Sequence, residues 1–218
     1  MAASVITCTV QVGSGGFAIA QKVAERLGFR YFDWEITSEA AARAGVSPEA
    51  VAASEHVPSF LERMMLRLFS ASALGTEESA VVIASEPAIV DAAVQSLSSE
   101  NYRLFIERVV MELAEHGDAV IVGHAAAAIL RNTPSTLRVL LHSSMSKRIE
   151  RLAKEQVLSP SLAEGTVRQS DKDRFELFNR AYKINWLDAT NYDIASNTDR
   201  GAVDLAVDTI VQTAQAIP

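Results

Sequence analysis

The feature that most constrains the fold is a glycine-rich turn near the N-terminus, made of Gly13, Ser14, Gly15 and Gly16. The preceding residues 5–12 are mostly apolar and β-branched, and apolar residues recur at helical spacing after the turn, which predicts strand, turn and helix in succession. In that context backbone N–H groups and the helix dipole can meet an anion without any side-chain charge. We therefore expect the turn to bind phosphate. The alternative is a tight strand-to-helix connection that binds no ligand.

The turn departs from the strict phosphate-binding loop at its end. The strict motif has a lysine after the last glycine and then a Ser or Thr for magnesium, but these places hold Gly16 and Phe17. The motif is therefore degenerate, and phosphate contacts at residues 13–17 are expected from the backbone.

Strands and helices alternate along most of the chain. Further strands are expected at residues 29–33, 119–122, 137–141 and 192–195, and helices at residues 38–44, 101–116, 145–154, 161–181 and 202–216. Residues 47–97 have a mostly helical pattern, and no linker divides the chain. Such alternation favours a parallel sheet with helices on both faces, so residues 1–218 are expected to form a single α/β domain.

Composition excludes several classes of partner. Lys and Arg total 20 against 27 Asp and Glu, and the net charge of -7 argues against a nucleic-acid surface or attraction to anionic membranes. No apolar run approaches the roughly 18 residues of a membrane span, and the single Cys8 fits a buried structural thiol in a reducing cytoplasm. We expect a cytoplasmic protein with small-molecule partners. Apolar residues 60–74 could pack a homodimer, although the sequence does not decide the oligomeric state.

One expected helix carries a candidate set of phosphate ligands. Arg168, Asp171 and Arg174 stand at i, i+3 and i+6, so all three could project toward one anion, and mobile arginines are what phosphoryl transfer needs. Lys172 and Asp173 interleave with them. The alternative is therefore a solvated helix face with local ion pairs.

Two further candidates end predicted strands, where α/β folds usually place ligand-binding groups. His124 follows the strand at residues 119–122, and Asp33 ends the strand at residues 29–33. The alternatives are a capping or buried histidine and an aspartate that caps the next helix.

Taken together, these residues resemble the cytidylate kinase-like family, relatives of the P-loop nucleoside monophosphate kinases, over nearly the whole chain. The resemblance is carried by Gly-Ser-Gly-Gly at residues 13–16, Tyr-Phe-Asp at 31–33, Val-Ile-Val-Gly at 120–123, Arg-Ile-Glu-Arg at 148–151, Ser-Asp-Lys-Asp-Arg at 170–174, and Trp186 with Asn-Tyr-Asp at 191–193. It implies a three-layer P-loop NTPase-like α/β fold with a mostly parallel central sheet flanked by helices. It also implies a helical insertion at about 47–100 and a helical lid at about 159–186.

The same resemblance implies transfer of the ATP γ-phosphoryl group to a nucleoside monophosphate such as CMP, with Mg²⁺ bridging phosphates. On this mapping residues 13–17 cradle the ATP phosphates. The acceptor is faced by Asp33, His124 and Asp171, and the transferring group is neutralised by Arg168, Lys172 and Arg174.

At three positions the sequence departs from the family pattern, and these departures allow an alternative function. The family commonly has arginine where this chain has Val10, Phe17 and His124. Each lost charged hydrogen bond to phosphate costs on the order of 1.5 to 3 kcal/mol. The alternative is therefore a catalytically weak or inactive nucleotide-binding regulatory protein. A third reading is an interaction domain that keeps only the scaffold and binds through residues 47–97.

Overall fold

The computed structural model describes residues 2–33, 99–200 and 203–217. Residues 1–33 and 110–218 belong to one compact unit, which contains an all-parallel five-stranded sheet in the order β2-β3-β1-β4-β5. The strands are β1 (Val5–Val10), β2 (Arg30–Asp33), β3 (Ala119–Val122), β4 (Thr136–His142) and β5 (Ile194–Asn197). The chain therefore has the α/β fold that alternation predicts. Residues 38–44 and 47–97, with the candidate dimer segment 60–74, lie outside the described residues.

Strand β1 is central because its residues suit burial on both faces. All six are buried, as expected for an inner parallel strand. Ile6, Cys8 and Val10 join the main core on one side, whereas Thr7 and Thr9 alternate with them. Burial raises the pKa of the Cys8 thiol to about 12, which confirms the expectation of a buried structural cysteine.

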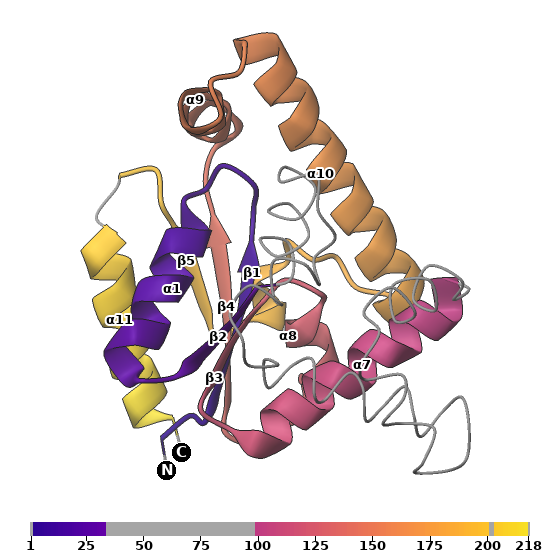
Figure 1. The fold of residues 1–218 in the computed structure, drawn as a ribbon, viewed down its shortest axis with the longest axis vertical. Coiled ribbons are helices and arrows are strands. Elements are labelled where there is room, and N and C mark those ends of the chain that lie inside the picture. The colour runs from indigo at the N-terminus through magenta and orange to yellow at the C-terminus, as the bar shows by residue number, and fades with distance from the viewer. Residues whose placement is uncertain (1, 34–98, 201–202, 218) are drawn as a thin grey trace, which may run out of the picture. The chain divides into compact units, whose positions relative to one another are not determined.

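Two amphipathic helices cover the face of the sheet that carries Cys8. These are α1 (Gly16–Leu27) and α11 (Val203–Ala216), which pack side by side, as Figure 1 shows. Helix α1 buries Ile19 and Val23 at helical spacing and ends where Gly28 adopts a left-handed conformation with φ of 69°. The short helix α8 (Ala126–Ile129), which the sequence pattern did not predict, packs on β1 from the other face (Figure 1). Helices on both faces of the sheet make a three-layer fold.

The segment expected to form a lid is one long helix. Helix α10 (Pro160–Tyr182) begins after Ser159, whose hydroxyl accepts a hydrogen bond from the Leu162 N–H, and Pro160 occupies the first turn. It packs against α9 (Met145–Glu155) through an apolar cluster of Leu152, Ala163 and Val167. The predicted helices at residues 145–154 and 161–181 are thus confirmed, as is the helix at 101–116, observed as α7 (Ser99–His116). None of the described helices combines the length and apolarity needed to cross a membrane.

The last strand begins two residues later than the predicted start at residue 192. The reason is a short 3-10 helix, η1 (Ala189–Asn191), which Tyr192 closes by donating its N–H to the Ala189 carbonyl. The Tyr192 hydroxyl also donates to the Trp186 carbonyl at 2.6 Å, and the Asp193 carboxylate pairs with Arg138 at 2.7 Å. Both residues therefore belong to the turn, and pairing of β5 with β4 starts at Ile194.

Candidate functional site

The glycine loop (residues 11–16) follows the central strand β1. At this strand the order of the sheet reverses, because β2 and β3 lie on one side of β1 and β4 and β5 on the other. Strand β1 pairs with β3 on one side and β4 on the other. In open parallel sheets, ligands bind at the carboxyl ends of the strands at such a switch point. The Gln11 N–H donates a hydrogen bond to the Leu141 carbonyl of β4, and the Ser14 N–H donates to the Gln11 carbonyl. The loop is thus a tight turn held to the sheet.

Two glycines are required by the conformation of this loop. Gly13 and Gly15 have φ of 76° and 74°, in the left-handed region that side chains disfavour. At Gly13 space is lacking as well, since a β-carbon would lie 2.4 Å from the Arg148 carbonyl oxygen. At Gly15 a β-carbon would have no atom within 4 Å among the described residues, its chain neighbours aside, so none of these residues fills that side of the loop.

Gly16 is required by packing instead. A β-carbon there would lie 2.7 Å from Cγ1 of Val10 and 2.9 Å from Cβ of Leu141, both in the main core. The position of the missing lysine therefore has no room for a side chain. Phe17, at the next position, is partly buried and packs against the same core.

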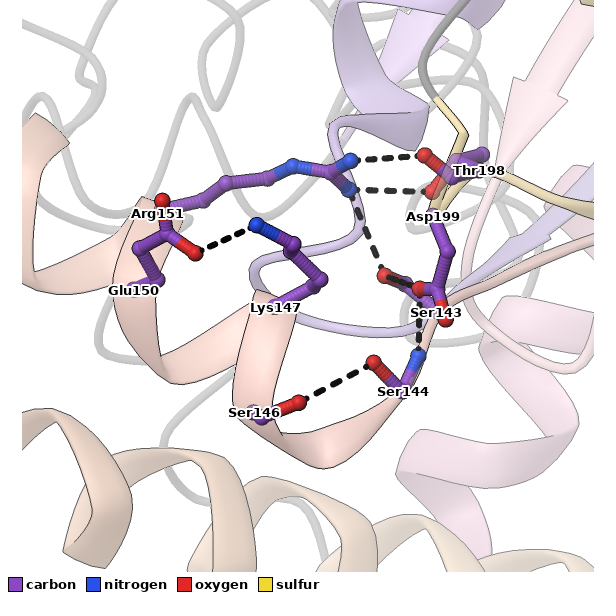
Figure 2. A network of polar contacts seen from close by, with 8 residues as sticks. All are labelled: Ser143, Ser144, Ser146, Lys147, Glu150, Arg151, Thr198 and Asp199. Carbon is purple, nitrogen blue, oxygen red and sulfur yellow. Dashed lines mark hydrogen bonds and ion pairs between the residues drawn. The ribbon is translucent and has the colours of Figure 1, made fainter.

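Two arginines of α9 bind the carbonyl groups of the glycine loop. Arg148 donates from Nε to the Val12 carbonyl at 2.7 Å, and its two Nη atoms donate to the Asp171 carboxylate, each at 2.7 Å. The Arg148 side chain is only 2% exposed, so its charge is buried, whereas the Asp171 side chain is partly exposed. Arg151 donates to the Ser14 carbonyl at 2.9 Å and to Thr198, as Figure 2 shows for the Thr198 contacts.

The carbonyl contacts leave loop N–H groups available. Within the part of the chain that the structure describes, the N–H groups of Gly13 and Gly15 donate to no acceptor. The Gly16 N–H lies 3.2 Å from the Ser14 hydroxyl oxygen, its acceptor. The loop therefore presents unsatisfied donors beside the N-terminus of α1, which is the arrangement that binds phosphate.

The three candidate ligands of α10 make different contacts. Arg168 pairs with Glu164 at 2.7 Å on the helix surface, where its side chain is 63% exposed. Asp171 is occupied by Arg148, and Arg174 stacks its guanidinium 5.8 Å from the centre of the Trp186 ring. Lys172 is exposed. The structure thus does not bring the three side chains to one point.

The two strand-end candidates lie on neighbouring strands. Asp33 pairs in register with Val122, and His124 follows two residues later, so both are at the carboxyl edge of the sheet. Asp33 is buried and its carboxylate accepts a hydrogen bond from the Tyr31 hydroxyl at 3.0 Å. Burial and, secondarily, the nearby charge of Arg174 lower the pKa of His124 from 6.5 to about 4. The imidazole is therefore neutral at pH 7.

Comparison with known proteins identifies the family. Residues 5–200 match the model of the cytidylate kinase-like family. The chain belongs to this family. It is 22% identical over 111 residues to a cytidylate kinase of Halobacterium salinarum, covering 51% of this chain and 58% of the relative. It is 26% identical over 109 residues to a cytidylate kinase of Methanopyrus kandleri, covering 46% and 56%. The match thus spans less than two thirds of these curated relatives.

A solved structure supports the fold of this family member. The crystal structure of an uncharacterized protein from Eubacterium ventriosum superposes with a TM-score of 0.66 at 18% identity, covering 97% of this chain and 98% of that one. At that identity the likeness concerns the fold alone.

Three residues that hold the loop, Arg148, Arg151 and Thr198, were not expected from the sequence to have a role in the site. The available signal was the three-residue spacing of the two arginines at the start of the helix after β4, the strand next to β1. Helical residues three apart lie on one face, and here that face carries the loop contacts. Thr198 gave no signal, because its contact with Ser14 joins positions far apart in the sequence.

The described residues do not form a protein-built metal site. No group of three or more His, Cys, Asp or Glu side chains gathers in residues 2–33, 99–200 or 203–217. The Ser14 hydroxyl is engaged by the Gly16 N–H, and Phe17 stands where the strict loop has a hydroxyl. The donor set fits phosphate through backbone N–H groups and does not fit Mg²⁺ by itself.

Proposed function

We propose that this protein binds ATP through its phosphates at the glycine loop and transfers the γ-phosphoryl group to a nucleoside monophosphate, with CMP as the favoured acceptor. The observation that carries the proposal is the pair of N–H groups at Gly13 and Gly15 beside the N-terminus of α1. Membership of the cytidylate kinase-like family supports the reaction class.

In this reaction an oxygen of the acceptor phosphate forms a bond to the γ-phosphorus while the bond from that phosphorus to the β-phosphate oxygen breaks and ADP leaves. Backbone N–H groups of residues 13–17 would hold the ATP phosphates, and Mg²⁺ bound with the nucleotide would offset part of the negative charge on them. Little covalent chemistry falls to the protein, because positioning and charge stabilisation dominate such transfers.

Side chains at the edge of the sheet and on α10 supply the remaining roles. Arg174 stabilises the negative charge of the transferring group, while Asp33 and His124 face the acceptor. Arg168 and Lys172 are exposed, and an exposed ion pair such as that of Arg168 with Glu164 is weak enough to exchange its carboxylate for a phosphate. Asp171 is assigned to Arg148 rather than to the acceptor, since both its oxygens bind that guanidinium.

A second candidate function is nucleotide binding without phosphoryl transfer. It is favoured by the loss of charge around the loop: Gly16 has no room for a lysine, Val10 is buried, and His124 is neutral. Such a protein would bind ATP through the backbone yet stabilise the transition state poorly, because the missing donors act on the charge that develops there.

Calorimetry followed by an assay for ADP distinguishes the two functions. ATP is titrated with magnesium present, then CMP, dCMP and UMP are added and ADP is measured. Transfer predicts ATP binding, ADP formation with at least one acceptor, and loss of turnover in Arg174→Ala. The control is Arg180→Ala, which removes an exposed arginine of the same helix and should retain turnover. Binding without ADP supports the second function, and an absence of binding refutes both.

A further inference from the structure

Three side-chain donors bind two carbonyl groups of the glycine loop. The Val12 carbonyl accepts from Arg148, and the Ser14 carbonyl accepts from Arg151 and, at 2.7 Å, from the Thr198 hydroxyl. These donors come from α9 and from the end of β5, elements that follow the loop by more than a hundred positions. The conformation of the loop is thus set from outside it.

The orientation of these carbonyls fixes the orientation of two amides. In a trans peptide unit the C=O and the following N–H point in opposite directions. Holding the Val12 and Ser14 carbonyls toward α9 and β5 therefore turns the N–H groups of Gly13 and Gly15 away from them. Both of these N–H groups donate to no acceptor among the described residues.

The same contacts bring positive charge to the loop. A guanidinium that donates to a carbonyl polarises the peptide unit, so the N–H of that unit becomes a stronger donor. Arg148 is held by the Asp171 carboxylate. Arg151 is held by Thr198 and by the Ser143 hydroxyl, as Figure 2 shows. Both guanidinium groups are thereby fixed on the backbone.

We propose that Arg148, Arg151 and Thr198 are positioning residues that aim the Gly13 and Gly15 N–H groups at bound phosphate and convey charge to it through the peptide units. This inference rests on the proposed function of the glycine loop as the phosphate site. It explains how a loop with no room for a lysine at Gly16 acquires a positive potential without a side chain that touches the ligand.

The test uses inorganic tripolyphosphate as the probe, in calorimetric titrations and in NMR spectra of the ¹⁵N-labelled full chain. Thr198→Val removes the donor to Ser14, whereas Thr198→Ser keeps it. Arg151→Gln removes the charge. Lys147→Gln is the matched control, since Lys147 lies on the same helix and, within the described ranges, pairs with Glu150 and not with the glycine loop, as Figure 2 shows for the Glu150 contact.

We expect tripolyphosphate to shift the Gly13 and Gly15 amide signals and leave the Gly28 signal in place. Binding should weaken about threefold to tenfold in Thr198→Val and about tenfold to a hundredfold in Arg151→Gln, with smaller amide shifts, whereas Thr198→Ser and Lys147→Gln should resemble the wild type. If Arg151 and Thr198 had a purely structural role, their substitution would lower the urea midpoint of unfolding. The shifts that tripolyphosphate causes in the amide signals of the folded protein would then stay unchanged.

Two results separate this inference from the proposed function. If Thr198→Val and Arg151→Gln bind tripolyphosphate as tightly as the wild type, with unchanged amide shifts, the inference is overturned even where the wild type forms ADP from ATP and CMP. If the variants weaken tripolyphosphate binding as expected but the wild type forms no ADP, the inference stands and phosphoryl transfer is overturned. A wild type whose loop amides do not respond to tripolyphosphate also overturns the inference.

Discussion

Replacing Gly16 by alanine should destabilise the protein, although alanine is the better helix former. In a helix interior, Gly to Ala gains about 0.5 to 1 kcal/mol, and the gain is smaller at Gly16 because it is the first residue of α1. Here the new methyl group would lie 2.7 Å from Cγ1 of Val10 and 2.9 Å from Cβ of Leu141, and both residues are at most 1% exposed. Overpacking of such a site costs about 1 to 3 kcal/mol. The expected net loss is about 1 to 2 kcal/mol.

The assay is equilibrium unfolding in urea of the wild type, Gly16→Ala, Val10→Ala and the double variant. Val10→Ala removes the atom closest to the new methyl group, so the double variant should lose about 1 kcal/mol less than the sum of the single losses. If Gly16→Ala is as stable as the wild type, the packing argument for the missing lysine is refuted. Strictly additive losses would place the strain away from Val10.

Three further predictions concern buried and titratable groups. Asp171→Asn should lower the free energy of unfolding by about 3 kcal/mol, because it leaves the buried Arg148 charge without its carboxylate partner. Glu164→Gln, at an exposed ion pair of the same helix, should lower it by less than about 0.5 kcal/mol. Equal losses of the two variants in urea unfolding would contradict this. Because the pKa of His124 is lowered from 6.5 to about 4, the unfolded chain binds a proton that the folded chain excludes. The stability this group contributes at pH 7, at most about 3 kcal/mol, is therefore lost as the pH falls through that window, and His124→Gln should flatten the pH dependence of urea unfolding there. The Cys8 thiol, buried with its pKa raised to about 12, should react with a thiol-specific disulfide reagent only in denaturant, and rapid reaction of the native protein would disprove its burial.

The fold could be predicted because its signals are local. The periodicities of apolar residues mark β1 and α1, and Gly28 ends α1 directly before the strand expected at residues 29–33. The start of β5 was misplaced because Tyr192 has a residue type typical of strands, while its hydrogen bonds to a preceding turn decide its place. Hydrogen bonds within the turn overrode the strand preference of a single residue at that point.

The candidate site was predicted only in part, because its decisive contacts involve the backbone. A side chain that binds a carbonyl group leaves no pattern in the residue it contacts, so neither the link from Arg148 to Val12 nor that from Thr198 to Ser14 could be deduced from residue types. The sequence also cannot tell why a glycine is needed. Gly15 is required for its backbone angle, whereas Gly16 is required for space.

The most direct test of the central claim compares ATP binding in two glycine variants with calorimetry. Gly15→Ala and Gly28→Ala each place a methyl group at a left-handed residue where the described residues, chain neighbours aside, leave no atom within 4 Å, so both should lose about 1 to 2 kcal/mol of stability. Only Gly15 belongs to the glycine loop. We predict that the wild type and Gly28→Ala bind ATP with magnesium equally well, and that Gly15→Ala binds about tenfold more weakly. Equal ATP affinity in all three proteins would show that the phosphates of ATP are not held by this loop.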